Sequence, residues 1–223
     1  MCSTNDAVGA RASFWDRRFA REGRVWGERP AGAAVLAAAE FRRRGVADVL
    51  VPGCAYGRHS IYLSAQGFTV TGVDFSEVAV GMAESWATDL GSTARHRLGD
   101  LLALPYDDAT FGGVFAFSIL HLFLRDDRAR AARELGRVLR PGGVLVAAAF
   151  STDDEEFGQG LQVEENTFDA RGGRPAHFFT PAELGSLFPE LAVERVETVV
   201  EPEDHGGRSH EHHLLLLVAS RPG

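Results

Sequence analysis

The sequence has few cysteines and no excess of positive charge. Cys2 and Cys54 are the only two cysteines among 223 residues, which excludes a disulfide framework. Lys and Arg number 23 against 31 Asp and Glu, so the formal net charge is −8 and a basic surface for nucleic acid or an anionic membrane is not expected. We therefore expect a small-molecule partner, no binding to nucleic acid or membranes, and a monomer or weak homodimer.

Long apolar runs and sorting signals are also missing. No stretch reaches the length of a transmembrane helix, and the first six residues, Met-Cys-Ser-Thr-Asn-Asp, have neither the basic nor the apolar region of a signal peptide. The expected location is the cytoplasm. The length suits one α/β domain with a full hydrophobic core, and internal repeats are not evident.

Apolar patterning predicts alternating strands and helices through the first two thirds of the chain. Strands are predicted at 48–51, 69–74, 94–98, 113–118 and 144–149. Helices are predicted at 13–22, 31–44, 57–66, 76–90 and 126–139. Such alternation indicates a doubly wound, mostly parallel sheet.

The last third departs from this alternation. Residues 151–179 are predicted to form an inserted lid, because a long insertion after a sheet strand is usually functional or disordered and this one contains apolar side chains. Thr180-Pro181-Ala182-Glu183 is a capping box that opens a short helix. Two more strands, 191–200 and 213–219, are predicted around a polar loop at 201–211, which brings the sheet to seven strands.

A glycine turn follows the first predicted strand. The turn reads Pro52-Gly53-Cys54-Ala55-Tyr56-Gly57-Arg58, and glycine there lets a ligand approach backbone amides at the start of a helix. Asp74 lies 21 residues beyond Gly53 (74 − 53) at the end of the second strand, followed by Phe75 and Ser76. A carboxylate at this position can accept two hydrogen bonds from a ribose diol. The sequence therefore predicts a ribose-bearing ligand.

The glycine spacing does not fit a dinucleotide, which needs Gly-x-Gly-x-x-Gly, because Ala55 and Arg58 occupy two of the glycine positions. The turn resembles motif I of the class I S-adenosylmethionine-dependent methyltransferases. Within that superfamily Val51-Pro52-Gly53-Cys54 is similar to the thiopurine, halide and tellurite-resistance branch of small-molecule enzymes. The chain departs from the usual motif at Val51, where many members carry an acid, and at Ala55, where they carry glycine.

The resemblance implies S-adenosylmethionine as cofactor, S-adenosylhomocysteine as product, and a last strand that enters the sheet antiparallel. It also implies a division of one domain, 1–223, into an N-terminal lid segment (1–30), a cofactor-binding core (46–150), the inserted lid and a C-terminal helix and hairpin (180–223). Two alternatives remain: a nicotinamide- or flavin-dependent oxidoreductase, and a non-catalytic protein that binds S-adenosylmethionine.

The same resemblance assigns further cofactor contacts. Asp100 is placed toward the exocyclic amine of adenine, with Leu101 and Leu102 along the ring. Trp26 lies in the segment that folds over the cofactor in similar enzymes. Ser118 and His121 follow the fourth strand, beside the transferable methyl group.

Candidate residues on the acceptor side are less specific. His121 is interpreted as a general base or substrate contact, with an outward-pointing loop residue as the alternative. His177 is a second candidate base or a packing contact. Tyr56 either lines the acceptor cavity or covers the methionine moiety.

The densest group of histidines, together with Arg208, lies near the end of the chain. This group comprises His205, His210, His212 and His213. It is interpreted as a solvent-exposed loop, a metal site, or a substrate contact through His205 and Arg208. No metal is expected, because the Cys/His spacing of a structural zinc site is absent and methyl transfer from a sulfonium does not require one.

The acceptor itself is predicted to be a small molecule, with a thiol or chalcogenide as one candidate. A thiol needs no strong base, because its thiolate is already appreciable near neutral pH. A hydroxyl acceptor would require a base at His121 or His177.

Overall fold

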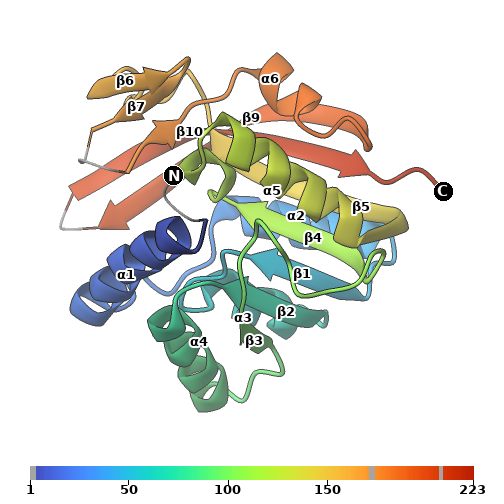
Figure 1. The fold of residues 1–223 in the computed structure, drawn as a ribbon. Helices are drawn as coiled ribbons and strands as arrows, with labels where there is room; N and C mark the ends of the chain where they lie inside the picture. Colours follow the sequence, from blue (N-terminus) through green and yellow to red (C-terminus); the bar gives the residue numbers. More distant parts are fainter. Residues whose placement is uncertain (1–3, 171–173, 206–207) are drawn as a thin grey trace.

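The computed structural model describes residues 4–170, 174–205 and 208–223 (Figure 1). The helices are α1 (Thr4–Glu22), α2 (Gly32–Arg43), α3 (Arg58–Ala65), α4 (Glu77–Asp89), the 3-10 turn η1 (Leu120–Leu122), α5 (Arg125–Val138) and α6 (Pro181–Ser186). The strands are β1 (Asp48–Pro52), β2 (Thr69–Asp74), β3 (Arg95–Leu98), β4 (Phe111–Phe117), β5 (Leu139–Phe150), β6 (Leu161–Glu164), β7 (Thr167–Asp169), β8 (Ala176–His177), β9 (Ala192–His205) and β10 (Arg208–Ser220).

Seven strands form the main sheet in the order β3-β2-β1-β4-β5-β10-β9. The first five are parallel to their neighbours, whereas β10 pairs antiparallel with β5 and with β9. This confirms the predicted doubly wound sheet and its antiparallel C-terminal strand. The strand order reverses between β1 and β4, and ligands of open α/β sheets bind in the crevice at such a switch point.

Apolar side chains on both faces of the sheet form separate cores. Leu50, Val114 and Leu145 pack toward α5 and α6, and their chain neighbours Val49, Phe115 and Val146 pack toward α2 and α3. Figure 1 shows α5 in front of the sheet and α2 behind it. Because successive residues of a strand point to opposite faces, strands buried on both sides are apolar throughout. This explains the uninterrupted apolar runs of β1 and β5.

Local signals set the helix starts. Ser76 accepts a hydrogen bond from the Ala79 backbone N–H at 3.1 Å, and Thr180 accepts one from that of Glu183 at 3.2 Å. Both are the predicted N-caps, which satisfy amides that a helix leaves without partners. No helix in the described part of the chain combines the length and apolarity needed to cross a bilayer.

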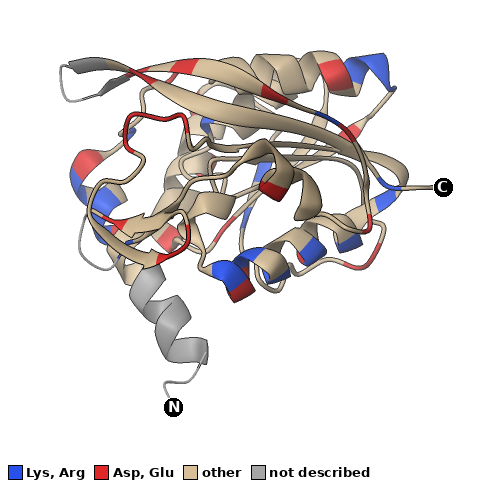
Figure 2. Cartoon of the chain, turned by 90° about the horizontal axis from the view of Figure 1, so that it is seen from above, with Lys and Arg blue, Asp and Glu red and all other residues tan. Residues whose placement is uncertain are grey.

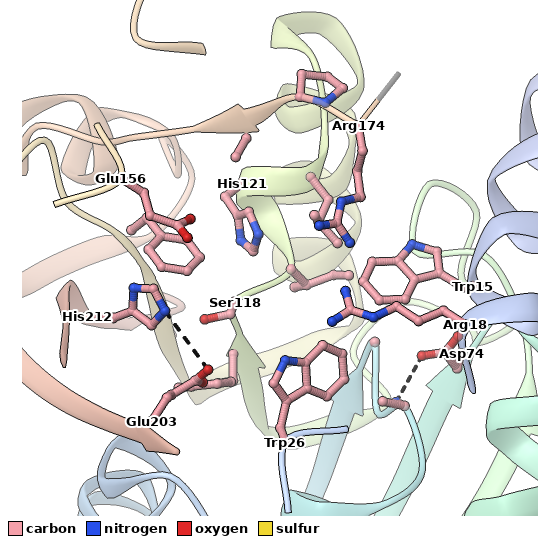
Figure 3. Close-up of a pocket in the computed structure, with 18 of the residues that line it drawn as sticks. Trp15, Arg18, Trp26, Asp74, Ser118, His121, Glu156, Arg174, Glu203 and His212 are labelled. Atoms are coloured by element: carbon pink, nitrogen blue, oxygen red, sulfur yellow. Dashed lines mark hydrogen bonds and ion pairs between the residues drawn. The ribbon is translucent and has the colours of Figure 1, made fainter. Parts of the chain in front are cut away.

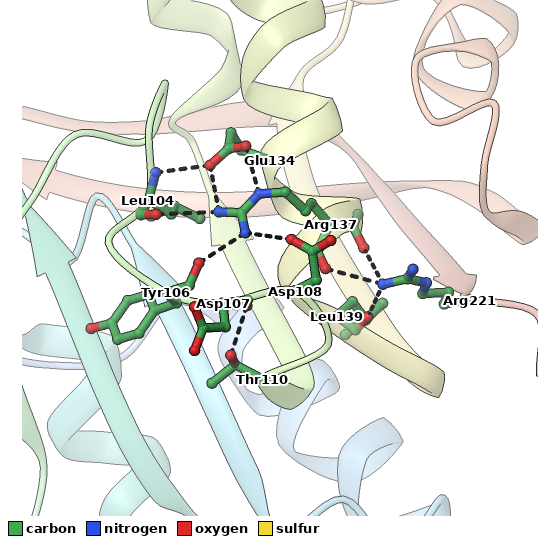
Figure 4. A network of polar contacts seen from close by, with 10 residues as sticks. Leu104, Tyr106, Asp107, Asp108, Thr110, Glu134, Arg137, Leu139 and Arg221 are labelled. Carbon is green, nitrogen blue, oxygen red and sulfur yellow. Dashed lines mark hydrogen bonds and ion pairs between the residues drawn. The ribbon is translucent and has the colours of Figure 1, made fainter.

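A polar network fixes the connection between β3 and β4 against α5 (Figure 4). Arg137 donates to the carboxylates of Glu134 and Asp108 at 2.8 Å each and to the Tyr106 carbonyl at 2.8 Å. Arg221 donates to the Leu139 carbonyl at 2.6 Å, which ties the end of the chain to the start of β5. Figure 2 shows charges of both signs on the same elements, with basic positions recurring along α5 beside acidic ones.

Three segments differ from the sequence prediction. Helix α1 begins at Thr4 rather than residue 13, and the expected lid, 151–179, contains a three-stranded sheet of β6, β7 and β8. The polar loop predicted at 201–211 was wrong: β9 and β10 stay paired as far as His205 and Arg208. Polar side chains were taken as a loop signal, but a hairpin that extends past the apolar core can carry polar side chains and still satisfy its backbone groups by strand pairing.

Glu40 gives the fold a testable dependence on pH. Its side chain is buried beside three arginines, and although burial would raise the pKa of Glu40, hydrogen bonds from Arg43 and Arg44 lower it to about 2. A carboxyl with a lowered pKa stabilises the fold above its unfolded pKa, and this contribution is lost as the pH falls toward the folded value. Glu40→Gln is therefore expected to lower the free energy of unfolding at pH 7 by roughly 1–3 kcal/mol. Urea unfolding at several pH values measures this.

The difference between wild type and variant should shrink as the pH falls from about 4.5 to about 2. The matched control is Glu197→Gln, because this exposed glutamate also pairs with an arginine, Arg195, at 3.1 Å. It should change stability by less than about 0.5 kcal/mol. A Glu40→Gln loss that stayed the same at pH 2 and pH 7 would mean that packing, not charge, is responsible.

Candidate cofactor and acceptor site

A cavity of about 360 Å³ lies at the carboxyl edge of the parallel strands (Figure 3). Its walls include Gly53 after β1, Asp74 at the end of β2, Ser118 after β4 and Phe150 at the end of β5. Helix α1, the 151–179 insertion and the β9–β10 hairpin supply the remaining walls. Its size is in the usual range for small-molecule sites.

The turn after β1 brings the backbone at Gly53 close to the side chain of Ile119. Gly53 has φ +63°, and a Cβ there would lie 2.7 Å from Ile119 Cδ1, so only glycine fits without a shift. Ala55 has φ 49°, the left-handed conformation that glycine adopts more readily. The Ala55 N–H donates to Asp74 Oδ2 at 2.9 Å, which holds the turn against the end of β2. The chain thus keeps the turn geometry at the position where alanine replaces the usual glycine.

Asp74 is fixed by backbone amides. Its Oδ1 accepts a hydrogen bond from the Ser76 N–H at 3.0 Å, in addition to the Ala55 bond to Oδ2. Burial raises the pKa of the Asp74 carboxyl, although these backbone hydrogen bonds work in the opposite direction. The carboxylate lines the cavity, and each oxygen has a further lone pair for a ligand hydroxyl. This is the geometry that a ribose diol requires.

Cys54 is a buried thiol in the same turn and lines the cavity. Burial and the neighbouring Asp74 carboxylate raise the pKa of the Cys54 thiol well above its ordinary value. The side chain therefore remains a neutral thiol.

Most of the predicted cofactor residues line the cavity. They are Trp26, Gly53, Cys54, Ala55, Arg58, Asp74, Phe75 and Ser118. Tyr56 lines it too, and its hydroxyl donates to the Gly27 carbonyl at 2.8 Å and accepts from the Trp26 N–H at 3.1 Å. Burial raises the pKa of Tyr56 to about 12, so it acts as a neutral brace that orders the segment before α2.

Six predicted cofactor residues do not line the cavity. Pro52 and Gly57 flank the turn, Ser76 caps α4, and Leu101 and Leu102 pack into the core. Asp100 accepts a hydrogen bond from the Leu102 N–H at 3.0 Å. The cavity does not reach the turn after β3, so the adenine contacts of that turn stay a prediction.

His121 and Ser118 line the cavity beside the end of β4 (Figure 3). His121 is carried by η1 and is buried, with its ring edge-on to Phe150 at 4.7 Å between centroids. Ser118 has φ 44°, a conformation that costs a non-glycine residue about 1–2 kcal/mol and is concentrated at functional sites. Both residues line the cavity, so a ligand in the cavity can contact them.

His177 is turned away from the cavity. Its Nδ1 lies 2.8 Å from Thr167 Oγ1 and its Nε2 lies 2.8 Å from Glu183 Oε1, and it is buried. The neighbours Ala176 and Phe178 line the cavity, and residues of an extended chain alternate between faces. The prediction of His177 as a candidate base is therefore corrected: it is a packing residue that joins the insertion to α6. The side chains of His205 and Arg208 lie outside the described residues.

Several cavity residues come from the predicted N-terminal lid, the predicted inserted lid and the C-terminal hairpin, but the sequence did not assign them individually to a cofactor or acceptor contact. They are Trp15, Arg18, Phe19, Glu156, Phe168, Arg174, Phe178, Glu203 and His212. The Arg174 guanidinium lies over the rings of Phe14 and Trp15, at 5.2 and 5.5 Å, and so links the insertion to α1 across the cavity. The aromatic pair in α1 was the only signal available in the sequence for this contact.

Comparison with known proteins agrees with this geometry. Residues 50–147 match the family described as a methyltransferase domain. A solved structure of 1,6-didemethyltoxoflavin-N1-methyltransferase from Burkholderia thailandensis, with bound 1,6-didemethyltoxoflavin and S-adenosylhomocysteine, has the same fold. Its TM-score is 0.75 and its identity 21%, over 100% of this chain and 92% of that one. The methyltransferase-domain match and the shared fold support a class I S-adenosylmethionine-dependent methyltransferase.

Two further relatives extend this comparison. A segment of 101 residues is 36% identical to 27-O-demethylrifamycin SV methyltransferase of Amycolatopsis mediterranei and covers 44% of this chain and 36% of that protein. A structure from work on the conversion of a disulfide bond into a thioacetal group during echinomycin biosynthesis matches with TM-score 0.77 and 22% identity. It covers 95% of this chain and 92% of that one. Matches to the first curated relatives span from 33% to 40% of their lengths.

S-adenosylmethionine is the cofactor of this methyltransferase fold, and the residues present fit it. Gly53 brings the turn so close to Ile119 that a Cβ would not fit, and the buried carboxylate of Asp74 faces the cavity. Asp74 would hold the ribose, and the Gly53–Arg58 turn would hold the methionine moiety. Trp26 and Phe75 would cover the ligand.

Proposed function

We propose that this chain transfers a methyl group from S-adenosylmethionine to the hydroxyl of a small organic acceptor. The observation that carries the proposal is a single cavity that joins Asp74 and the Gly53 turn to a wall formed by Ser118 and His121. A cofactor held by Asp74 and an acceptor held beside His121 would thus share one enclosed space. A cytoplasmic location and a monomer or weak homodimer remain predictions.

The acceptor side favours a ring-shaped or otherwise apolar molecule. Phe117, Phe150, Phe168 and Phe178 line the cavity, together with polar side chains such as His121, Glu156 and His212. Aromatic walls of this kind hold rings by stacked or edge-to-face contact. The polar groups would orient the molecule and select the atom that receives the methyl.

We infer the acceptor atom from the site itself, because the names of the similar proteins point to different acceptor atoms. One is named for 27-O-demethylrifamycin, one for the N1 position, and one was studied on a disulfide. We favour a hydroxyl because a buried histidine in the cavity is the group that such an acceptor needs as a general base. A thiol or chalcogenide acceptor is the competing case, in which His121 would only position the molecule.

The protein would contribute to methyl transfer by aligning the two reactants and by removing one proton. When bound, S-adenosylmethionine supplies a methyl group activated by the sulfonium charge. The walls of the cavity align the acceptor with that methyl and exclude water, and such alignment is worth roughly 7–11 kcal/mol in favourable cases. His121 would take the hydroxyl proton as the new bond to carbon forms.

A ligand screen by thermal shift tests the cofactor assignment. S-adenosylhomocysteine at about 100 times its Kd should stabilise the native state by about 2.7 kcal/mol and raise the Tm by several degrees. NAD and FAD should leave the Tm unchanged. Stabilisation by NAD or FAD alone would favour the oxidoreductase alternative, and binding of S-adenosylhomocysteine without turnover of any acceptor would favour a non-catalytic binding protein.

A further inference from the structure

We infer that Glu203, His210 and His212 bind one divalent transition-metal ion at the acceptor end of the cavity. The expectation from the sequence was that no metal is bound, because no zinc-finger spacing is present. A site made across two paired strands has no such spacing, because its ligands come together through strand register.

Strand register puts the three side chains on one face. His210 lies directly opposite Glu203 in the β9–β10 pair, and His212 follows His210 by two residues. Opposed residues and residues two apart share a face of a sheet. β5 ends at Phe150, opposite Leu214. The part of the hairpin before Leu214 therefore extends beyond its pairing with β5. Glu203 and His212 both line the cavity.

The ligand atoms are close together. The Nε2 atoms of His210 and His212 are 3.1 Å apart. His212 Nε2 lies 3.9 Å from Glu203 Oε2, a contact that Figure 3 marks with a dashed line. One ligand atom from each of the three residues lies within 4.8 Å of the others. Two nitrogens bound to one ion at about 2.1 Å each are separated by a similar distance, so the observed spacing needs little adjustment.

A buried carboxylate orients His212. The Nδ1 of His212 lies 3.0 Å from Asp154 Oδ2, and Asp154 is itself held by the backbone N–H groups of His213 at 2.8 Å and Glu156 at 2.9 Å. A proton on Nδ1 shared with Asp154 leaves the Nε2 lone pair directed toward Glu203 and His210. A histidine whose second nitrogen donates to a carboxylate is the usual form of a metal ligand, because the carboxylate fixes the tautomer and the ring. The ring is further held edge-on to Phe150, at 4.8 Å between centroids.

The ligand set indicates the kind of ion. Two imidazoles and one carboxylate suit Zn²⁺, Co²⁺, Fe²⁺ or Ni²⁺ rather than Mg²⁺ or Ca²⁺, which prefer oxygen ligands. Three protein ligands leave coordination positions open, and two of the three, Glu203 and His212, line the cavity. If the proposed hydroxyl acceptor is right, an oxygen of the acceptor would occupy one of them, and the ion would make that hydroxyl more acidic.

The test measures metal binding alone, without cofactor or acceptor. Protein that carries no histidine tag is treated with EDTA, desalted and titrated with Co²⁺, followed by visible absorption, and with Zn²⁺, followed by calorimetry. One ion per chain is expected. His210→Gln and His212→Gln should each weaken the affinity at least tenfold, and Asp154→Asn roughly 10- to 100-fold.

The matched control is His213→Gln, the next residue on β10, whose side chain lies on the opposite face. It should bind the ion like the wild type. Circular dichroism and the thermal shift with S-adenosylhomocysteine check that each variant is folded and keeps its cofactor site.

The site is wrong if the wild type binds no stoichiometric ion, or if His210→Gln and His212→Gln bind it as tightly as His213→Gln. In that case the two histidines form only a hydrogen-bonded pair. Metal binding without methyl transfer would contradict the proposed function and leave the site standing. Methyl transfer by protein that binds no metal would contradict the metal site and leave the proposed function standing.

Discussion

His121→Ala is expected to lower kcat by roughly 100- to 10,000-fold on a hydroxyl acceptor, because the variant loses the group that removes the proton in the transition state. The ring is buried and lies edge-on to Phe150 in the wall of the cavity. Rates over a range of pH provide the measurement. The rise in rate that a titrating imidazole produces should disappear in the variant.

His121→Gln separates the two possible roles of this residue. Glutamine keeps a hydrogen-bonding side chain of similar length but does not titrate, so a base would be lost as completely as in the alanine variant. A residue that only positions the acceptor would be largely restored. On a thiol or chalcogenide acceptor both variants should lower the rate modestly and leave its pH profile to the acceptor. Wild-type rates in both variants on every accepted substrate would remove His121 from the mechanism.

Asp74→Ala is expected to weaken the binding of S-adenosylhomocysteine by roughly 2–4 kcal/mol, which corresponds to a factor of roughly 30 to 700 in Kd. The variant loses the carboxylate that would bind the ribose diol. It also leaves the N–H groups of Ala55 and Ser76 without their acceptor, which loosens the turn. Calorimetry with S-adenosylhomocysteine measures the effect.

Asp74→Asn is the informative companion, because its single carbonyl oxygen accepts from one of these amides and from one ribose hydroxyl. An intermediate affinity is expected. The Tm of each variant without ligand shows how much of the loss comes from the turn itself. An unchanged Kd in Asp74→Ala would mean that the ribose is held elsewhere.

The predicted site residues that line the cavity are local in the chain. The turn from Gly53 to Arg58 and the carboxylate at Asp74 follow neighbouring strands, and their spacing follows from strand, turn and helix lengths. The alternation of apolar segments likewise predicted the parallel sheet, whereas the antiparallel last strand was predicted from the family resemblance. Short-range signals were sufficient because each element buries its own apolar face next to its neighbour in sequence.

The other walls were not predictable in this way. Whether His177 or Phe178 faces the cavity depends on a single step along the chain, and only the pairing of β7 with β8 decides it. His212 meets Asp154 across 58 residues of sequence. The polar half of the β9–β10 hairpin has no apolar alternation, so its register, and with it the grouping of Glu203 with His210, carried no signal in a single sequence.

Cys54 is a thiol in the turn that would hold the cofactor, where it could itself be methylated. A methyltransferase that places a sulfur atom in its cofactor turn carries a potential methyl acceptor of its own, because a thiolate is a strong nucleophile toward carbon. Burial and the charge of Asp74 keep the pKa of this thiol high, so the reactive anion is scarce. Asp74, the carboxylate that would hold the ribose, therefore adds to the effect of burial in keeping this thiol in its less reactive neutral form.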